Sequence, residues 1–442
     1  MKQKYLYFTG ITTTLCIVII ILLTFTIETI AYESLPLPRN VISAGEMSSF
    51  VIKPDGTLWA WGSNAFGMLG DGTTIHRYYP VKIMRDVVSV SAGNSHTMAI
   101  RSDNSLWAWG DNWRGQLGDG TDTSSCTPIK IMDDVAYVSA GSRYTMAIKT
   151  DGSLWAWGAG PLGDGTMINH YYPIWVMDDV VAVSAGFAHT MAIKTDGSLW
   201  AWGSNEYGQL GDGTRTIREW DGYSQQMICI ADNDRLVPTI IMEGVIAVSA
   251  GETHTMAIKN DGSLWAWGLN IYGMQILPIL PILTPVQVFD DVVAISSGFA
   301  WTMTIRADGS LWKLGVDNDY LARYWCIDTI DKYDQYHWGL LEYFYWPYPT
   351  VGTYRFAPVH IMDDVLAVST NGGYSGTGWN HTLAIRSDGS LWSWGSNYFG
   401  QLGHSFGLRD GLDSEMSWEE RQEMWRILET PKQVMDSVKL PN

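Results

Sequence analysis

Asp-Gly-Ser-Leu-Trp-Ala-Trp-Gly, residues 196–203, is one of seven similar phrases in this chain of 442 residues. The phrases begin at Asp55, Asp103, Asp151, Asp196, Asp261, Asp308 and Asp388, so their spacings are 48, 48, 45, 65, 47 and 80 residues. A basal unit of about 47 residues is too small to bury its own hydrophobic face, so the copies must pack on one another. The chain is therefore a repeat protein, and we expect its function to lie on surfaces and insertions.

Each unit contains four short strand patterns. In the second copy these are residues 88–93, 96–101, 105–109 and 128–135, the last opening with Pro128 as an edge strand can. The Asp-Gly pair between the second and third patterns predicts a tight type I′ hairpin. Four such strands make one blade of a β-propeller.

The Trp-x-Trp pair indicates how blades pack. Trp107 and Trp109 project from one face of a strand, while Leu106 and Ala108 project from the other. A blade with two apolar faces is suited to lie between two neighbours.

The two ends of the repeat region predict a closed ring. Residues 431–438 match the last strand of a unit, and residues 41–45 match the first strand of the next. Closure removes the exposed edges of an open sheet. We therefore predict an all-β, seven-bladed β-propeller over residues 40–442, with insertions at 215–237, 316–357 and 404–430.

The N-terminus has the pattern of an export signal. Lys2 and Lys4 precede an uncharged stretch from Tyr5 to Ile27. Residues 1–31 fit either a cleaved signal peptide or a retained membrane anchor, followed by a linker at 32–39. Both alternatives predict an exported protein that is secreted or anchored at the cell surface.

Composition argues against several function classes. A net charge of −18 disfavours nucleic acid as a partner. The chain shows no nucleophile elbow, phosphate loop, metal cluster or convergent acid pair, so we expect no enzyme activity, cofactor or metal. Four histidines at one repeat position (96, 189, 254 and 381) are interpreted as structural. Asp-Asp pairs recur at 133–134, 178–179, 290–291 and 363–364, which predicts an acidic band on one face that would attract a basic partner.

The repeat resembles that of the regulator-of-chromosome-condensation family. Its motifs appear most fully between Ser184 and Thr214, as Ser-Ala-Gly, His-Thr, Asp-Gly-Ser-Leu-Trp-Ala-Trp-Gly-Ser-Asn and Gly-Gln-Leu-Gly-Asp-Gly-Thr. Together with the export signal, the resemblance implies an exported bacterial member of this family. The resemblance implies a seven-bladed propeller that works by binding. One secreted relative inhibits β-lactamases, and the founding member is an exchange factor for a small GTPase. A plant member senses ultraviolet light, but its Gly-Trp-Arg-His-Thr motifs are absent here.

The insertions are the predicted recognition sites, because tyrosine and tryptophan dominate protein interfaces. The candidate residues are Tyr324, Trp325, Trp338, Tyr343, Tyr345, Trp346 and Tyr348 in the sixth unit, with Trp220 and Tyr223 in the fourth. The alternative is that the long insert packs as a small core of its own. A helix beginning at Ser417 is expected in the seventh unit.

The sequence therefore predicts a non-catalytic recognition or scaffold propeller, expected to be a monomer. Its partner would be another protein, such as an exported enzyme that it inhibits, or a cell-surface glycan. The alternatives are an exchange factor-like regulator of a small GTPase and a structural cell-envelope protein that self-associates.

Overall fold

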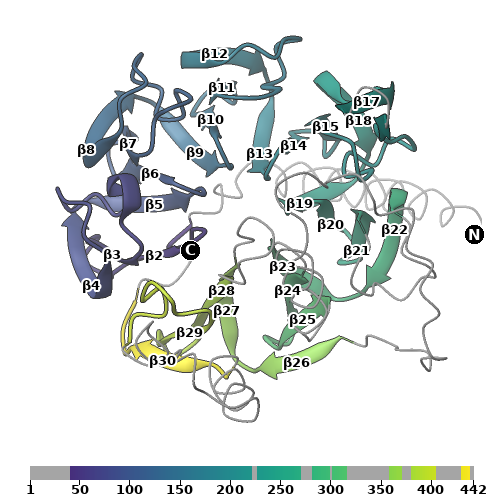
Figure 1. Ribbon diagram of the computed structural model, residues 1–442. Coiled ribbons are helices and arrows are strands. Elements are labelled where there is room, and N and C mark those ends of the chain that lie inside the picture. The colour runs from purple at the N-terminus through teal and green to yellow at the C-terminus, as the bar shows by residue number, and fades with distance from the viewer. Residues whose placement is uncertain are drawn as a thin grey trace, which may run out of the picture. The chain divides into compact units, whose positions relative to one another are not determined.

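The computed structural model describes residues 40–221, 226–269, 281–298, 301–315, 358–370, 380–404 and 430–438. Within them, seven four-stranded antiparallel sheets stand around a central axis (Figure 1). The predicted all-β, seven-bladed propeller is confirmed. The first strand of each blade lies nearest the axis and the fourth lies outermost, as Figure 1 shows.

The strands follow one order in every blade. Blades 1 to 3 comprise β1 (Ile42–Ala44), β2 (Ser48–Ile52), β3 (Leu58–Gly62) and β4 (Arg77–Met84); β5 (Val87–Ala92), β6 (His96–Arg101), β7 (Leu106–Gly110) and β8 (Ser125–Met132); and β9 (Val135–Ala140), β10 (Tyr144–Lys149), β11 (Leu154–Gly158) and β12 (His170–Met177).

Blades 4 to 7 comprise β13 (Val180–Ala185), β14 (His189–Lys194), β15 (Leu199–Gly203) and β18 (Arg235–Met242); β19 (Val245–Ala250), β20 (His254–Lys259), β21 (Leu264–Gly268) and β22 (Ile282–Phe289); β23 (Val292–Ser297), β24 (Trp301–Arg306), β25 (Leu311–Gly315) and β26 (Val359–Met362); and β27 (Val365–Thr370), β28 (His381–Arg386), β29 (Leu391–Gly395) and β30 (Lys432–Met435). A short 3-10 turn, η1 (Ala65–Gly67), follows β3, and a separate hairpin of β16 (Ile217–Asp221) and β17 (Gln226–Ala231) lies within the predicted fourth-unit insertion.

The turn between the second and third strands differs from the predicted type I′ hairpin. In blade 1 the amide of Gly56 bonds to the Lys53 carbonyl, and the Lys53 amide bonds to the Thr57 carbonyl. Gly56 has φ 76°, whereas Asp55 is not among the residues with positive φ. A type I turn followed by one left-handed residue forms a three-residue hairpin loop, so only the glycine position needs positive φ. The prediction placed the right residues in the turn but chose the wrong turn type.

Blades interlock through the Trp-x-Trp strand, as predicted. Trp109 is fully buried against Phe50 and Leu58 of the preceding blade. Leu106 and Ala108, on the other face of the same strand, pack in the cluster that contains Trp157 of the next blade. The hydrophobic core is therefore a series of layers between blades.

The ring closes between the first and last blades. Trp61 of β3 packs with Leu383 and Leu391 of blade 7 in one buried cluster. The Val438 amide bonds to the Gly389 carbonyl, as the Val87 amide bonds to the Gly56 carbonyl at the start of the second blade. Val438 therefore takes the first position of the innermost strand of blade 1, and β1 supplies the rest of that strand.

Several predicted features lie outside the described residues. These are the N-terminal segment 1–39, the aromatic insert 316–357 and the helix predicted from Ser417. Among the residues that the structure describes, no helix is long and apolar enough to cross a membrane.

Candidate functional site: the loop face and axial channel

The propeller has two unlike faces. The turn between first and second strands and the long connection between third and fourth strands emerge together, because a Cβ built on Gly62 would lie 2.4 Å from the Met47 carbonyl oxygen. We call this side the loop face. The Asp-Gly turns and the turns that lead into the next blade share the other side, since Gly56 lies against Asp86. We call that side the hairpin face.

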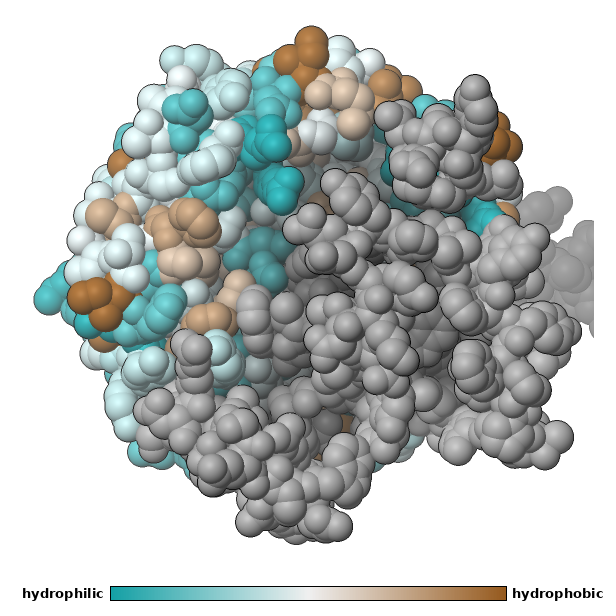
Figure 2. Space-filling model, in the orientation of Figure 1, coloured by the Kyte–Doolittle hydropathy of each residue, from teal (hydrophilic) through white to brown (hydrophobic). Residues whose placement is uncertain are grey.

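The loop face of the first three blades carries exposed apolar side chains. Trp113, in the connection after β7, is 75% exposed. Phe66 and Ile75 lie in the corresponding connection of blade 1, and Met167 and Ile168 in that of blade 3, and all four are exposed. Figure 2 shows one side of the molecule, on which hydrophobic groups are spaced among hydrophilic ones in the described part. Non-obligate protein interfaces have a mixed apolar and polar composition of this kind, in which aromatic side chains such as Trp113 are enriched.

The predicted recognition residues are not brought together in the described part of the structure. Tyr324, Trp325, Trp338, Tyr343, Tyr345, Trp346 and Tyr348, together with Tyr223, lie outside the described residues. Trp220 belongs to β16, where it pairs with Met227 of β17. The aromatic candidates of the sixth unit belong to the connection between β25, which ends at Gly315, and β26 (Val359–Met362). In other blades the connection between the third and fourth strands emerges on the loop face.

The hairpin face is acidic, as the Asp-Asp pairs predicted. Those pairs fall in the turns between blades, for example Asp133 and Asp134 between β8 and β9. Several aspartates there already pair with a basic residue on the second strand, such as Asp86 with Arg101 at 2.9 Å. Arg101 also covers a half-buried tryptophan, with its guanidinium carbon 5.8 Å from the ring centroid of Trp107. Much of this charge therefore serves the blades themselves.

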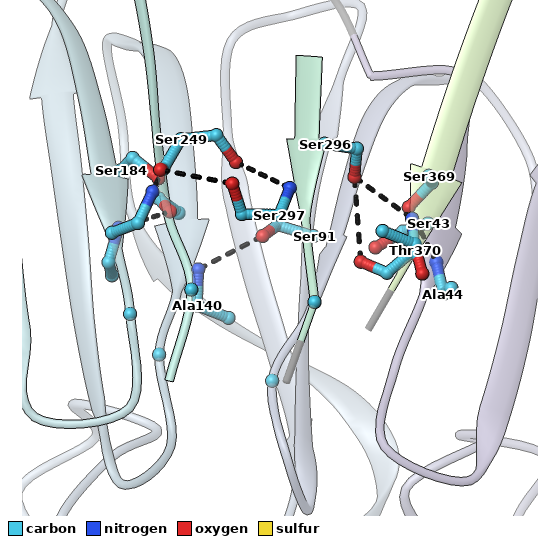
Figure 3. Close-up of a pocket in the computed structure, with 18 of the residues that line it drawn as sticks. Ser43, Ala44, Ser91, Ala140, Ser184, Ser249, Ser296, Ser297, Ser369 and Thr370 are labelled. Atoms are coloured by element: carbon cyan, nitrogen blue, oxygen red, sulfur yellow. Dashed lines mark hydrogen bonds between the residues drawn. The ribbon is translucent and has the colours of Figure 1, made fainter. Parts of the chain in front are cut away.

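A ring of serine hydroxyls surrounds the axis (Figure 3). Each innermost strand is an edge strand, and its last amide donates to a serine of the preceding blade. The Ala92 amide donates to Ser43 at 2.9 Å, and the Ala44 amide closes the ring by donating to Ser369 at 2.9 Å. The intervening acceptors are Ser91, Ser139, Ser184, Ser249 and Ser296. The serines satisfy amides that would otherwise lack a partner.

A polar cavity of about 230 Å³ lies inside this ring. All seven innermost strands line it, together with the loop-face turns that follow them. Tyr137 of β9 also lines the cavity, and burial raises the pKa of its phenol.

One carboxyl group lines the cavity without a complete set of partners. Glu252, in the turn after β19, has a buried Oε2 that makes no hydrogen bond. Burial raises the pKa of Glu252 to about 8, and the charge of Glu46 adds to the effect. Glu46 is itself buried, in the corresponding turn of blade 1.

The repeated histidines are structural links between blades, in agreement with their interpretation from sequence. His96 Nε2 lies 2.9 Å from Thr145 Oγ1 of the next blade, and His381 Nε2 lies 2.7 Å from Ser49 Oγ across the closure. Burial lowers the pKa of His96 to about 4 and that of His381 to about 3, so both are neutral at pH 7. His189 and His254 make the same link, to Thr255 and Thr302.

Sequence reasoning missed Trp113 and Glu252 because it concentrated on insertions. Both stand at variable positions within the basal repeat. Glu252 takes the place that Asn94 and Ser142 take in blades 2 and 3. An alignment of the repeats would have marked this variable position, which follows Ser-Ala-Gly in the first five blades.

Comparison with known proteins agrees with this architecture. The solved structures of yeast RCC1 (Prp20) bound to Kap60 and of human WBSCR16 are similar, with TM-scores of 0.63 and 0.57 at 20% and 18% identity. The alignments cover 90% and 77% of this chain, and 85% and 86% of those chains. At these identities the likeness shows the fold alone.

Among curated proteins, the ultraviolet-B receptor UVR8 of Arabidopsis thaliana is 30% identical over 195 residues. That alignment covers 42% of this chain and 38% of the receptor's length. The family model of the regulator of chromosome condensation (RCC1) repeat matches residues 55–100, and a second model of that repeat matches residues 376–401. The model of the RCC1-like domain matches residues 87–322, which is more than half of the 442 residues. The protein therefore belongs to the family of RCC1-like repeat propellers.

Proposed function

We propose that this chain is a non-catalytic recognition propeller that binds another protein through its loop face. The observation that carries the proposal is the exposure of Trp113, Phe66, Ile75, Met167 and Ile168 on that face. A large aromatic side chain such as Trp113 gains free energy when a partner covers it, and it costs little rotamer entropy to fix.

Relatives favour a protein as the partner. Yeast RCC1 has been solved bound to Kap60, and the structure of Prp20p from Saccharomyces cerevisiae is described together with its binding to Gsp1p and histones. This chain differs from them in sequence, so we transfer only the kind of function, a propeller that binds proteins. The N-terminal pattern of residues 1–31 supports placing the propeller outside the cell, where an exported enzyme is one partner of suitable kind.

The test is interface mapping with matched variants. Cross-linking in the secreted and surface fractions of the producing cells would identify partners of wild-type protein, and Trp113→Ala and Ile168→Ala would then be compared by titration. Ile246→Ala is the control for Ile168→Ala, because Ile246 is 57% exposed beside the hairpin face and Ile168 is 64% exposed on the loop face.

We expect Trp113→Ala to weaken binding by at least about 2 kcal/mol and Ile246→Ala to leave it unchanged. Weakening by Ile246→Ala alone would move the site to the hairpin face. A folded wild-type protein that captures no protein in either fraction would contradict the proposed function.

A further inference from the structure

The axial cavity has a ring of serine hydroxyls and one carboxyl group in its lining. Its described lining contains serine hydroxyls, the side chains of Asn40, Asn94, Tyr137 and Thr370, backbone groups, one carboxyl group and several apolar side chains, and among these described residues there is no lysine, arginine or histidine. Each ring serine uses one lone pair to accept an amide, which leaves a second lone pair for another donor. The cavity is therefore suited to a ligand that donates hydrogen bonds.

Backbone carbonyl groups add to the negative potential at the loop-face end. The Gly251 carbonyl oxygen lies against Gly186, 2.5 Å from the position of an added Cβ, and the Gly298 carbonyl oxygen lies against Gly251 in the same manner, at 2.7 Å. The Gly251 carbonyl accepts the Phe187 amide at 3.3 Å, which leaves it a second lone pair. These three glycines also line the cavity.

Glu252 supplies a specific partner for a cation. Its buried Oε2 has no hydrogen-bond partner in the described part of the chain, which is costly for a carboxyl oxygen that has left water. Among the described residues, the groups that interact electrostatically with it are Glu46, from the turn of blade 1, and Tyr207, from the connection after β15. Neither is a cation, so the charge of an ionised Glu252 has no counter-ion among them.

We propose that the axial cavity binds a primary alkylammonium group, with Oε2 of Glu252 as the partner of its charge and the ring serines and turn carbonyls as further acceptors. An ammonium group carries three donors around one point and fits acceptors that converge from several blades. A guanidinium group is less suitable, because its planar fork needs two carboxylate oxygens side by side.

This inference does not depend on the loop-face partner. A free amine and a lysine side chain presented by a bound protein carry the same chemistry, and the two sources are separated by the probes below. Failure of the amine to bind would leave the loop-face proposal intact, since that proposal is tested with Trp113 variants.

The experiment is calorimetric titration of the full chain with n-butylammonium chloride between pH 6 and pH 9. Because the pKa of Glu252 is raised to about 8, an amine that binds its carboxylate must displace a proton at pH 7. We expect binding to tighten from pH 6 to pH 8, with proton release that shows as a dependence of the heat on buffer ionisation enthalpy.

Glu252→Gln should weaken binding at pH 8 by at least about tenfold, or about 1.4 kcal/mol, and abolish proton release. Glu243→Gln is the control, because it makes the same charge change at an exposed site on the hairpin face. Glu252→Asp keeps the charge but shortens the side chain, so its affinity for n-butylammonium should lie between those of wild type and Glu252→Gln. This variant provides the test if Glu252→Gln does not fold.

Nα-acetyl-lysine amide distinguishes the two sources. Binding as tight as that of n-butylammonium indicates that the cavity admits a lysine side chain with its backbone outside, whereas binding of the small amine alone indicates a free amine. The proposal is overturned if neither amine binds to wild-type protein, or if Glu252→Gln binds n-butylammonium as tightly as wild type does.

Discussion

At the scale of single residues, the interior of this propeller holds ionisable groups in their neutral forms. The four repeated histidines are fully buried, and burial lowers their pKa values to about 4 for His96 and His254 and to about 3 for His189 and His381. An unfolded histidine titrates near pH 6.5. Below that pH the unfolded state binds protons that the folded state does not bind. The contribution of these histidines to the free energy of unfolding is therefore fully present above about pH 6.5 and is lost as pH falls.

We therefore predict that the free energy of unfolding falls by several kcal/mol between pH 7 and pH 5, at roughly 2 kcal/mol per histidine. Glu252 acts in the opposite direction, because its folded pKa of about 8 is raised and its contribution is lost as pH rises. Urea unfolding at the two pH values measures the net change. His96→Gln should reduce the pH dependence by about the share of one histidine. An unchanged pH dependence in that variant would show that His96 is not the neutral buried group described here.

At the scale of the strand and its turn, blade 4 lacks an indole hydrogen bond that blades 1, 2, 3 and 5 have. Trp109 Nε1 donates to the Met68 carbonyl at 2.9 Å, and Trp157 Nε1 donates to the Gln116 carbonyl at 2.9 Å. Trp202 is equally buried, but its Nε1 has no partner. The third blade has a shortened connection in which Pro161 stands where Gln116 stands in blade 2. Proline keeps its carbonyl group, so the missing bond reflects the different backbone path of this connection rather than the loss of an acceptor.

This difference predicts unequal losses of stability for the same substitution at two tryptophans. Both substitutions replace an indole ring by a smaller phenyl ring. Trp109→Phe also removes a buried hydrogen bond, whereas Trp202→Phe does not. We expect Trp109→Phe to be the more destabilising by about 1 kcal/mol in urea unfolding at pH 7. Equal losses, or a larger loss for Trp202→Phe, would mean that the indole N–H bond does not contribute to stability.

The serine ring gives a second prediction at this scale. Ser91 is buried and its Oγ accepts the amide of Ala140 at 2.9 Å. Ser91→Ala leaves that amide without a partner and should cost about 1 to 2 kcal/mol of unfolding free energy. Ser102→Ala is the control, because Ser102 is exposed in a turn. A cost no larger than that of the control would indicate that water in the cavity replaces the hydroxyl.

The sequence predicts the blade well and the site poorly, for physical reasons. Period-two alternation repeats in seven units and the Trp-x-Trp pair in six of them, so strand positions and blade packing reinforce one another across the chain. The hairpin type was wrong because Asp-Gly suits both the two-residue turn and the loop with one left-handed glycine. The cavity was not predicted, because it forms only when seven strands distant in sequence meet, and no local pattern records that meeting. The aromatic insert remains a prediction.

At the scale of the whole molecule, stability depends on a closed circle of similar interfaces. Ser49 Oγ donates to the Gln401 carbonyl at 2.7 Å across the closure, and Thr255 Oγ1 donates to the Gln209 carbonyl at 2.8 Å between blades 4 and 5. If the closing interface is equivalent to the internal ones, Ser49→Ala and Thr255→Ala should destabilise the protein by similar amounts, about 1 to 2 kcal/mol each.

Unfolding of these two variants also reports on cooperativity. A single transition in each, followed by tryptophan fluorescence and by circular dichroism, is expected for a ring that opens as one unit. An early separate transition confined to Ser49→Ala would show that the first and last blades part before the remaining ring unfolds.

The meeting of the two chain ends has a consequence for connectivity. Val438 occupies in blade 1 the position that Val87 occupies at the start of blade 2. Asn40 occupies the next position of the same strand, where its carbonyl accepts the Val90 amide of blade 2. The backbone thus runs through the closure as though Val438 were followed by Asn40. A circular permutant with that junction, opened instead at the exposed turn around Asp133, would retain every interface between blades. The architecture of the propeller therefore does not require the chain to be opened between blades 1 and 7.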